Sequence, residues 1–449
     1  MTEGPIWKSL VSFAVPIFFG NLFQQLYNTA DSIIVGNFIG KEALAAVGSS
    51  THLIFLLIGF LHGVSMGAGV LIAKYYGAGD RENLQKGVHT IVAFGALAGL
   101  VLTVVGVTVT PFLLRLMGTP DNVLPSSVAY FRTYFMGAVA SVLYNFCTGI
   151  LQAVGDSRHP LHYLIASSLI NIGLDLLFVA VLGFGVASAA LATVISQCVA
   201  ATLCIRQLLR TSDVHRLEIR KIRLDPGMLA LIVRFGLPAG VQNSLVSFAN
   251  VMVQSNINAF GDSAMAGSGS YSKIEGFAFL PITAFAMALA TFMGQNLGAK
   301  QYERAKKGAR FGVLCAMLVA ELVGVVLWFS VPWLVRLFNT DPEVIAYGVR
   351  HCRTVSLFYG LLALNNSFNG VLRGAGRPGA PMVIMMASWC GLRIAYITVL
   401  VSIFHDIFFV FSAYPVTWAV SGVLFLIYYF RVDWLHTFDR LEQQEKSSA

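Results

Sequence analysis

The sequence is poor in charge. Asp, Glu, Lys and Arg make up 12% of its 449 residues, whereas about 25% is usual in a soluble domain. Hydrophobic residues make up 56%. A water-soluble core cannot bury that much apolar surface, and a disordered chain needs low hydrophobicity, so both classes are excluded. The composition predicts a protein that crosses a membrane many times.

Motifs of soluble catalysis are missing as well. The sequence has no Walker A segment, no GxSxG and no HExxH, so we expect neither an enzyme nor an ATP-driven pump. Its six cysteines form no CxxC pair, and we interpret them as free thiols. We expect no cofactor.

Long apolar runs are what the sequence does have. They are continuous rather than alternating, which predicts helices instead of a β-barrel. The expected spans are 8–36, 43–73, 87–110, 127–154, 160–182, 186–208, 229–259, 264–296, 308–331, 345–375, 380–402 and 407–430.

Basic residues are unevenly distributed between the connecting segments. Loops on one side of the expected spans, together with both chain ends, carry 21 Lys and Arg, and loops on the other side carry 6. Cytoplasmic loops are the basic ones, so we expect both termini in the cytoplasm of an inner or plasma membrane protein. The net charge of +8 then faces anionic lipid and predicts no nucleic-acid partner.

The two halves of the sequence resemble each other at a shift of 221 residues, which pairs Pro111 with Pro332 and Gly155 with Gly376. Each half holds six expected spans, an even number, so both halves begin on the same side of the membrane. We therefore predict an all-α polytopic protein with 12 transmembrane helices in two six-helix bundles, related by a pseudo-two-fold axis along the membrane normal. The expected parts are a bundle at 1–208, a cytoplasmic linker at 209–228 and a bundle with a short cytoplasmic tail at 229–449.

Polar side chains repeat at helical spacing in the first span of each half. Lipid cannot satisfy such groups, so these stripes face either protein or a water-filled cavity. We interpret them as lining a cavity, although hydrogen bonds between helices are the alternative. The residues are Asn21, Gln24 and Asn28 in the first half and Asn243, Ser247, Asn250 and Gln254 in the second.

Carboxylates inside the spans are rare, and each is costly there. Asp31 and Asp175 lie in the first half, and Asn171 precedes Asp175 by one helical turn on the same face. We interpret them as a coupling site that loads and releases H⁺, or as part of an oxygen cage for Na⁺. The alternative is a protonated acid that only ties two helices together.

The second half has different charged groups in its spans. Lys273, Glu275 and Arg393 are expected to line the cavity, with Glu275 and Arg393 forming either a structural pair or a substrate contact. Glu321 is alone in its span, and a packing role is favoured. Pro16 permits a helix bend that could respond to protonation of Asp31.

Several segments resemble the multidrug and toxic compound extrusion (MATE) transporters. In the first half these are PIFFGNLFQQLYNTADSIIVGNFIGKEALAAVG, GAGVLIAKYYGAGDRENLQKG and GILQAVGDSRHP, and in the second half MGQNLGAKQYERAKKG and GVLRGAGRPGAP. The resemblance implies two six-helix bundles that export small organic, often cationic and amphipathic compounds in exchange for H⁺ or Na⁺.

The resemblance also implies a site. In the DNA-damage-inducible (DinF-like) branch of that family the first bundle carries the cation site, and Asp31, Asn171, Asp175 and Thr193 match its pattern. A Na⁺ ion at these four residues is one implied form of the site. Other branches place acids in the second bundle, where this chain has Ser247 instead.

Two other functions remain open. A flippase for lipid-linked precursors would use the same scaffold with a basic cavity, which Lys273 and Arg393 allow and the two Asp residues oppose. An intramembrane enzyme would need a nucleophile or a metal cluster, and the repeat supplies amides instead. Transport between two halves of one chain requires only a monomer.

Overall fold

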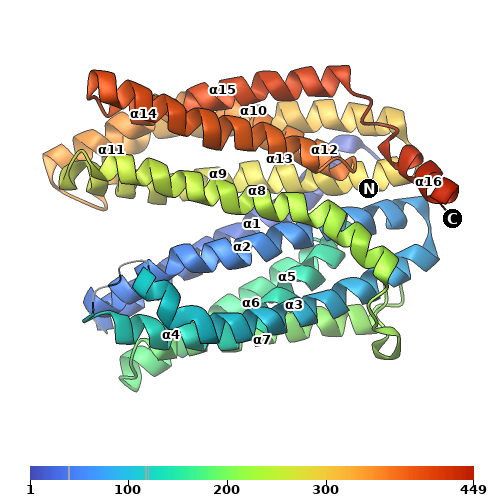
Figure 1. Ribbon diagram of the computed structural model, residues 1–449, viewed down its shortest axis with the longest axis horizontal. Helices are drawn as coiled ribbons and strands as arrows, with labels where there is room; N and C mark the ends of the chain where they lie inside the picture. The colour runs from blue at the N-terminus through green and yellow to red at the C-terminus, as the bar shows by residue number, and fades with distance from the viewer. Residues whose placement is uncertain (39–40, 117–118, 120, 449) are drawn as a thin grey trace. The chain divides into compact units, whose positions relative to one another are not determined.

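The structure is a computed structural model, and the residues it describes are 1–38, 41–116, 119 and 121–448. These residues form helices and connecting segments, without a β-strand among them. In chain order the α-helices are α1 (Ile6–Phe38), α2 (Lys41–Ala78), α3 (Arg81–Leu116), α4 (Leu124–Met136), α5 (Ala138–Ala153), α6 (Arg158–Asp175), α7 (Ala187–Arg210), α8 (Pro226–Asn258), α9 (Asp262–Gly298), α10 (Tyr302–Arg336), α11 (Pro342–Val355), α12 (Tyr359–Gly374), α13 (Gly379–Met385), α14 (Arg393–Phe404), α15 (Phe408–Arg431) and α16 (Thr437–Ser448) (Figure 1).

Four short segments with other helical geometry join these elements. Two of them are π-helical. This geometry is rare in proteins as a whole, but where it occurs it is often at a functional site. The π-helical segments are η1 (Leu176–Val181) and η4 (Met386–Leu392). The other two, η2 (Ile219–Lys221) and η3 (Ser356–Phe358), are 3₁₀-helical.

All twelve expected spans fall on helix. Ten segments of the described chain are long and apolar enough to cross a membrane, and the bent pair α4 and α5, which meet at 48°, raises that number to eleven. The expected span at 345–375 is the interrupted run α11–η3–α12, whose two helices are each too short to count alone. The all-α polytopic fold is therefore confirmed.

Acidic side chains begin several of the helices. Asp225 accepts a hydrogen bond from the backbone N–H of Met228 just inside α8, and Asp341 accepts one from Glu343 in the first turn of α11. In both cases a proline follows the Asp and supplies the fixed φ that suits a first helical residue.

The fourth span of each half is interrupted at matching places. Gly137 separates α4 from α5, and its repeat partner at the 221-residue shift, Phe358, is the last residue of η3. A Cβ atom on Gly137 would lie 2.5 Å from the Val194 side chain, so the first break requires a glycine. The second break is stabilised differently, by a carboxylate described below.

The chain folds into two compact units. One consists of Phe19–Gly240, and the other combines Met1–Phe18 with Val241–Ala449. These divisions differ from the expected boundaries at 208 and 229, because the first helix of each half passes from one unit into the other. The two crossings come two residues after Pro16 in α1 and two residues after Pro238 in α8.

Pro16 lies inside α1, which continues as a single helix from Ile6 to Phe38. A proline removes one helical hydrogen bond and weakens the helix locally. The proline therefore stands at the place where α1 changes unit, and a bend that answers to Asp31 stays a prediction.

Glycines allow close packing in the Phe19–Gly240 unit. A Cβ atom on Gly67 of α2 would lie 2.3 Å from the Phe235 carbonyl oxygen in α8, and one on Gly63 would lie 2.6 Å from the Gly240 nitrogen. Both pairs have the small-xxx-small spacing that lets two helix backbones touch, since Gly236 and Gly240 repeat it on the facing helix. The start of α8 is thereby held in this unit.

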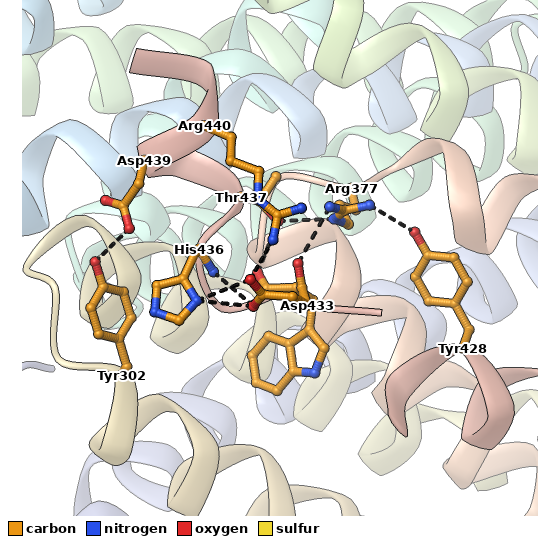
Figure 2. A network of polar contacts seen from close by, with 9 residues as sticks. Tyr302, Arg377, Tyr428, Asp433, His436, Thr437, Asp439 and Arg440 are labelled. Carbon is orange, nitrogen blue, oxygen red and sulfur yellow. Dashed lines mark hydrogen bonds and ion pairs between the residues drawn. The ribbon is translucent and has the colours of Figure 1, made fainter. Parts of the chain in front are cut away.

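The other unit is fastened at its C-terminal end by polar contacts around α16 (Figure 2). Arg377 donates to the Thr437 hydroxyl at 2.9 Å and to the Tyr428 hydroxyl at 3.2 Å. Asp439 of α16 accepts from the Tyr302 hydroxyl of α10 at 2.7 Å. These bonds attach α16 to Tyr302 at the start of α10 and to Arg377 just before α13, and Arg377 in turn bonds to α15.

Candidate functional site

The first candidate site lies in the Phe19–Gly240 unit and joins two carboxyl groups. Asp31 belongs to α1, and Asp175 is the last residue of α6, directly before the π-helical η1. The two side chains face each other within hydrogen-bonding reach, and Asp175 is fully buried. Two carboxyl groups this close in a span cannot both be charged at low cost, so a proton or a metal cation has to accompany them.

Asn171 connects Asp175 to α7. In the amide orientation that satisfies both of its ends, its nitrogen donates to Asp175 Oδ2 at 3.2 Å and its oxygen accepts from the Thr193 backbone N–H at 3.2 Å. Asn171 is 1% exposed. The structure thus brings Asp31, Asn171, Asp175 and Thr193 together.

One oxygen of each Asp is buried without a hydrogen-bond partner in the described part of the chain, namely Asp31 Oδ1 and Asp175 Oδ1. Carboxylate, amide and hydroxyl oxygens are ligands suited to a hard cation, and the same carboxylates can hold a proton. The donor set fits either H⁺ or Na⁺.

Tyrosines surround the acid pair, and the sequence analysis missed them. Tyr27 lies one helical turn before Asp31, and its hydroxyl bonds to Gln24 and Gln197. Tyr130 of α4 is buried and interacts electrostatically with both acids. The i, i+4 spacing of Tyr27 and Asp31 was a usable signal, whereas Tyr130 is distant in sequence and could not be found that way.

An apolar cluster lies on one side of the pair and includes Tyr130. Such a wall keeps water away and strengthens every electrostatic interaction of the two acids. Its members are Ile34, Val35, Tyr130, Val179, Val186, Ala189 and Ala190.

The structure explains the presence of only some of the polar side chains in the first span of each half. In α1, Gln24 and Asn28 are exposed, and Asn21 is half-buried. In α8, the Ser247 hydroxyl donates to the Asn243 carbonyl at 2.9 Å, and Gln254 donates to the Asn258 side chain at 2.8 Å. These two bonds stay within α8, and the cavity-lining role of the stripes remains a prediction.

The second candidate site lies in the other unit, around Glu275 of α9. The Tyr271 hydroxyl donates to Glu275 Oε1 at 2.7 Å, and the Tyr359 hydroxyl lies 2.8 Å from that of Tyr271. Both tyrosines are fully buried, and Glu275 is half-buried. Glu275 interacts electrostatically with Arg393, but within the described residues the two side chains form no salt bridge.

Arg393 begins α14 immediately after the π-helical η4, and it is 1% exposed. Its guanidinium carbon lies 4.5 Å from the centre of the Tyr414 ring and 5.4 Å from that of Trp389. Its Nε and Nη2 donate to the Thr417 hydroxyl at 3.3 and 3.1 Å, and its Nη1 reaches Asn250 Oδ1 at 3.5 Å.

Lys273 is separate from this group. Its side chain is exposed, and its ammonium lies 5.5 Å from the centre of the Phe338 ring, beyond the end of α10. It is two residues from Glu275 and therefore on a different face of α9.

Glu321 has a structural partner. Its Oε2 accepts from the backbone N–H of Gly360 at 2.9 Å, in the first turn of α12 after the η3 break. A helix start carries N–H groups without an intrahelical partner and favours a negative charge, so Glu321 caps α12 from the side.

Ten or eleven apolar helical segments in the described chain, arranged as two similar halves with Asp175 buried inside one of them, define a polytopic membrane transporter. The MatE family model matches residues 16–177 and 238–399, one stretch in each half, and this chain belongs to the MatE family. The two matches begin at Pro16 and Pro238 and confirm the internal repeat.

Curated relatives match over almost the whole chain. The chain is 31% identical to "Probable multidrug resistance protein YoeA" of Bacillus subtilis, over 94% of this chain and 93% of the relative. It is 27% identical to "Probable multidrug resistance protein NorM" of Thermotoga maritima, over 89% and 87%. A solved MOP superfamily transporter from Pyrococcus furiosus superposes with a TM-score of 0.91 at 24% identity, over 97% of this chain and 98% of that one, and shows the same fold.

Proposed function

We propose that this protein exports small organic, often cationic and amphipathic compounds across the plasma or inner membrane in exchange for H⁺ or Na⁺. The names of the two curated relatives support multidrug export. The observation that carries the coupling proposal is the buried contact between Asp31 and Asp175, to which Asn171 is hydrogen-bonded.

The coupling step follows from charge. With a proton or Na⁺ between them, the two carboxyl groups are stable in a dry environment; without it, mutual repulsion favours a conformation in which water reaches them. A cation taken up on one side of the membrane and released on the other thereby drives the change between two states. Residues of α1 up to Phe18 belong to one unit, and those from Phe19 on, including Asp31, belong to the other. A change at the acid pair therefore acts on a helix that both units share.

The four residues of this site support placing the chain in the DinF-like branch, whose pattern they match. The Ser247 hydroxyl, at the position where other branches carry an acid, is bonded to its own helix and supplies no charge. The flippase alternative has no support from the relatives above, which are named as multidrug resistance proteins.

We further propose that both chain ends face the cytoplasm, on the strength of the 21 to 6 division of basic residues. A reporter fused after Ala449 that fluoresces only in the cytoplasm tests this orientation. Activity of a periplasmic reporter at the same position would overturn it.

The coupling proposal is tested in inverted vesicles containing the full chain, with rhodamine 123 as the fluorescent compound and H⁺ and Na⁺ gradients imposed separately. Wild-type protein should accumulate the dye with one gradient, and Asp31→Asn or Asp175→Asn should abolish that accumulation. Asp121→Asn, at an exposed loop position, is the matched control and should behave as wild type. Unchanged gradient-driven transport in Asp31→Asn would move the coupling site elsewhere.

A further inference from the structure

The buried arginine of the second candidate site has donors to spare. A guanidinium carries five N–H groups, and Arg393 uses three of them in the described part of the chain. Nη1 of Arg393 lies 3.5 Å from the amide oxygen of Asn250, which is a long contact. A carboxylate oxygen in its place would normally lie about 2.7–2.9 Å from the guanidinium nitrogen. Asn250 is exposed, so the longest bond of the buried Arg393 is the one to an exposed partner.

The guanidinium is held in place by its neighbours rather than by a counter-ion. The Trp389 indole donates to the Ser421 hydroxyl at 3.0 Å, which fixes the ring against Arg393. Tyr414 and Thr417 come from α15 and hold the guanidinium from that helix. A buried positive charge without a bonded carboxylate is costly, and a ligand that supplies one would remove that cost.

Glu275 shows the complementary arrangement. One carboxylate oxygen is bonded to Tyr271, whose hydroxyl meets that of Tyr359, and the half-buried carboxylate is not neutralised by a bonded cation in the described residues. The two opposite charges lie in one unit and interact without a salt bridge between them, so a molecule that carries both signs can pair with each of them.

We propose that Glu275 and Arg393 form a receptor for zwitterionic compounds, an assignment that rests on the export function proposed above. The carboxylate of the ligand replaces the Asn250 contact and bonds to Nη1 and the unused N–H groups of Arg393. The amine or delocalised cation of the same ligand lies against Glu275. The site therefore favours an aromatic compound that bears both groups over the corresponding ester, which is only a cation.

Three dyes with a common ring system test the Arg393 contact and the Glu275 contact of this receptor separately. Rhodamine 110 carries a carboxylate and a cation, rhodamine 123 is its methyl ester and only a cation, and fluorescein lacks the cation. Binding to the purified full-length chain in lipid nanodiscs is followed by fluorescence anisotropy. We expect rhodamine 110 to bind about tenfold more tightly than either of the other dyes, the equivalent of one charge-assisted contact.

Arg393→Gln should remove the preference for rhodamine 110 and change the affinity for rhodamine 123 by less than about twofold. Glu275→Gln should weaken both rhodamines. Arg350→Gln is the matched control, because Arg350 is an exposed arginine of the same unit whose partner is Asp406, and it should leave the preference intact. A preference that survives Arg393→Gln overturns the proposal, as does fluorescein binding as tight as that of rhodamine 110.

A second variant covers the case in which Arg393→Gln does not fold. Thr417→Val removes the hydroxyl that accepts two guanidinium bonds and should reduce the preference for rhodamine 110 while the protein still binds rhodamine 123. An undiminished preference in that folded variant also counts against the receptor. A folded wild type that binds neither rhodamine contradicts the export function itself, whereas equal binding of both contradicts only the zwitterion receptor.

Discussion

At the scale of single residues, the charged groups in the spans have distinct tasks that composition alone does not separate. Glu321 accepts from a backbone N–H at a helix start, whereas Asp31 and Asp175 face each other. The difference lies in what surrounds each carboxylate. A residue that caps a helix can be replaced by any good acceptor, but one that binds a proton or a cation cannot.

Glu321→Leu should destabilise the protein, because it leaves the Gly360 N–H buried without an acceptor. We expect a loss of about 1–3 kcal/mol in the free energy of unfolding. Glu321→Gln keeps an acceptor oxygen and should cost much less. Thermal unfolding of both variants in the same detergent measures the difference, and equal losses would show that the charge and not the hydrogen bond matters.

Thr193→Val distinguishes the two coupling ions. A Na⁺ ion bound by the four-residue site needs oxygen ligands, so loss of the hydroxyl should weaken Na⁺-driven transport about tenfold or more. A proton needs only the carboxylates, and H⁺-driven transport should then be close to wild type. Thr193→Ser retains the hydroxyl and serves as the control. Transport that falls equally with both gradients would argue for a role of Thr193 in packing.

At the scale of helices, close backbone contact and helix interruption shape the fold. The repeat supplied the positions of the spans, because each one is a long apolar run with recognisable ends. It did not reveal the breaks, since Gly137 and Phe358 have different side chains and the second break depends on Glu321 from another helix. Nor could it place the π-helical segments, whose geometry depends on tertiary packing.

Gly67→Ala should destabilise the crossing of α2 and α8, because the new Cβ would lie 2.3 Å from a backbone oxygen that cannot move alone. We expect the free energy of unfolding to fall by about 1–3 kcal/mol. Gly59→Ala on the same helix is the control, since its Cβ would meet no atom of the described residues within 4 Å. That change should be neutral or slightly stabilising, as alanine favours helix over glycine. Equal unfolding temperatures for the two variants would rule out the tight crossing.

The linker between the halves should loosen in acid. Burial lowers the pKa of His215, so folded linker binds fewer protons than released linker, and attachment weakens as the pH falls below about 6.5.

Proteolysis of the linker should therefore be severalfold faster at pH 5.5 than at pH 7.5, relative to a denatured sample at each pH. In a His215→Gln variant the rates at the two pH values should be closer to each other, because glutamine does not gain a proton. A pH response that persists unchanged in that variant would exclude His215 as its cause.

At the scale of the whole molecule, sequence reasoning predicted the class and the repeat, but it did not predict that α1 and α8 each belong to two units. Apolar runs, basic loops and paired motifs are local or periodic, so they can be read directly from the chain. The passage of α1 and α8 between units is a property of contacts, and only Pro16 and Pro238 hint at it. The acid pair was predicted from Asp31 and Asp175, whereas the receptor-like geometry of Arg393 depends on η4 and α15.

Two fragments cut within the linker, 1–211 and 212–449, should not be stable when expressed separately. Each would hold a helix segment that belongs to the unit of the other, and the linker itself bonds to α3 through Gln85 and Thr90. Co-expression of both fragments should restore dye export. Export or protease resistance from either fragment alone would contradict the shared-helix division.

The division of α1 and α8 between the two units also determines the order in which the units can fold during synthesis. The unit Phe19–Gly240 is continuous, so it can close while the ribosome is still making the rest of the chain. The other unit needs Met1–Phe18, which leaves the ribosome first, and its remaining residues, which leave last. At about 5–20 residues per second, the early segment waits on the order of ten seconds or more for its partners. During that interval the lipid itself, or an insertion factor, has to shelter the apolar side chains of Leu10, Phe13 and Ile17, which the finished protein buries.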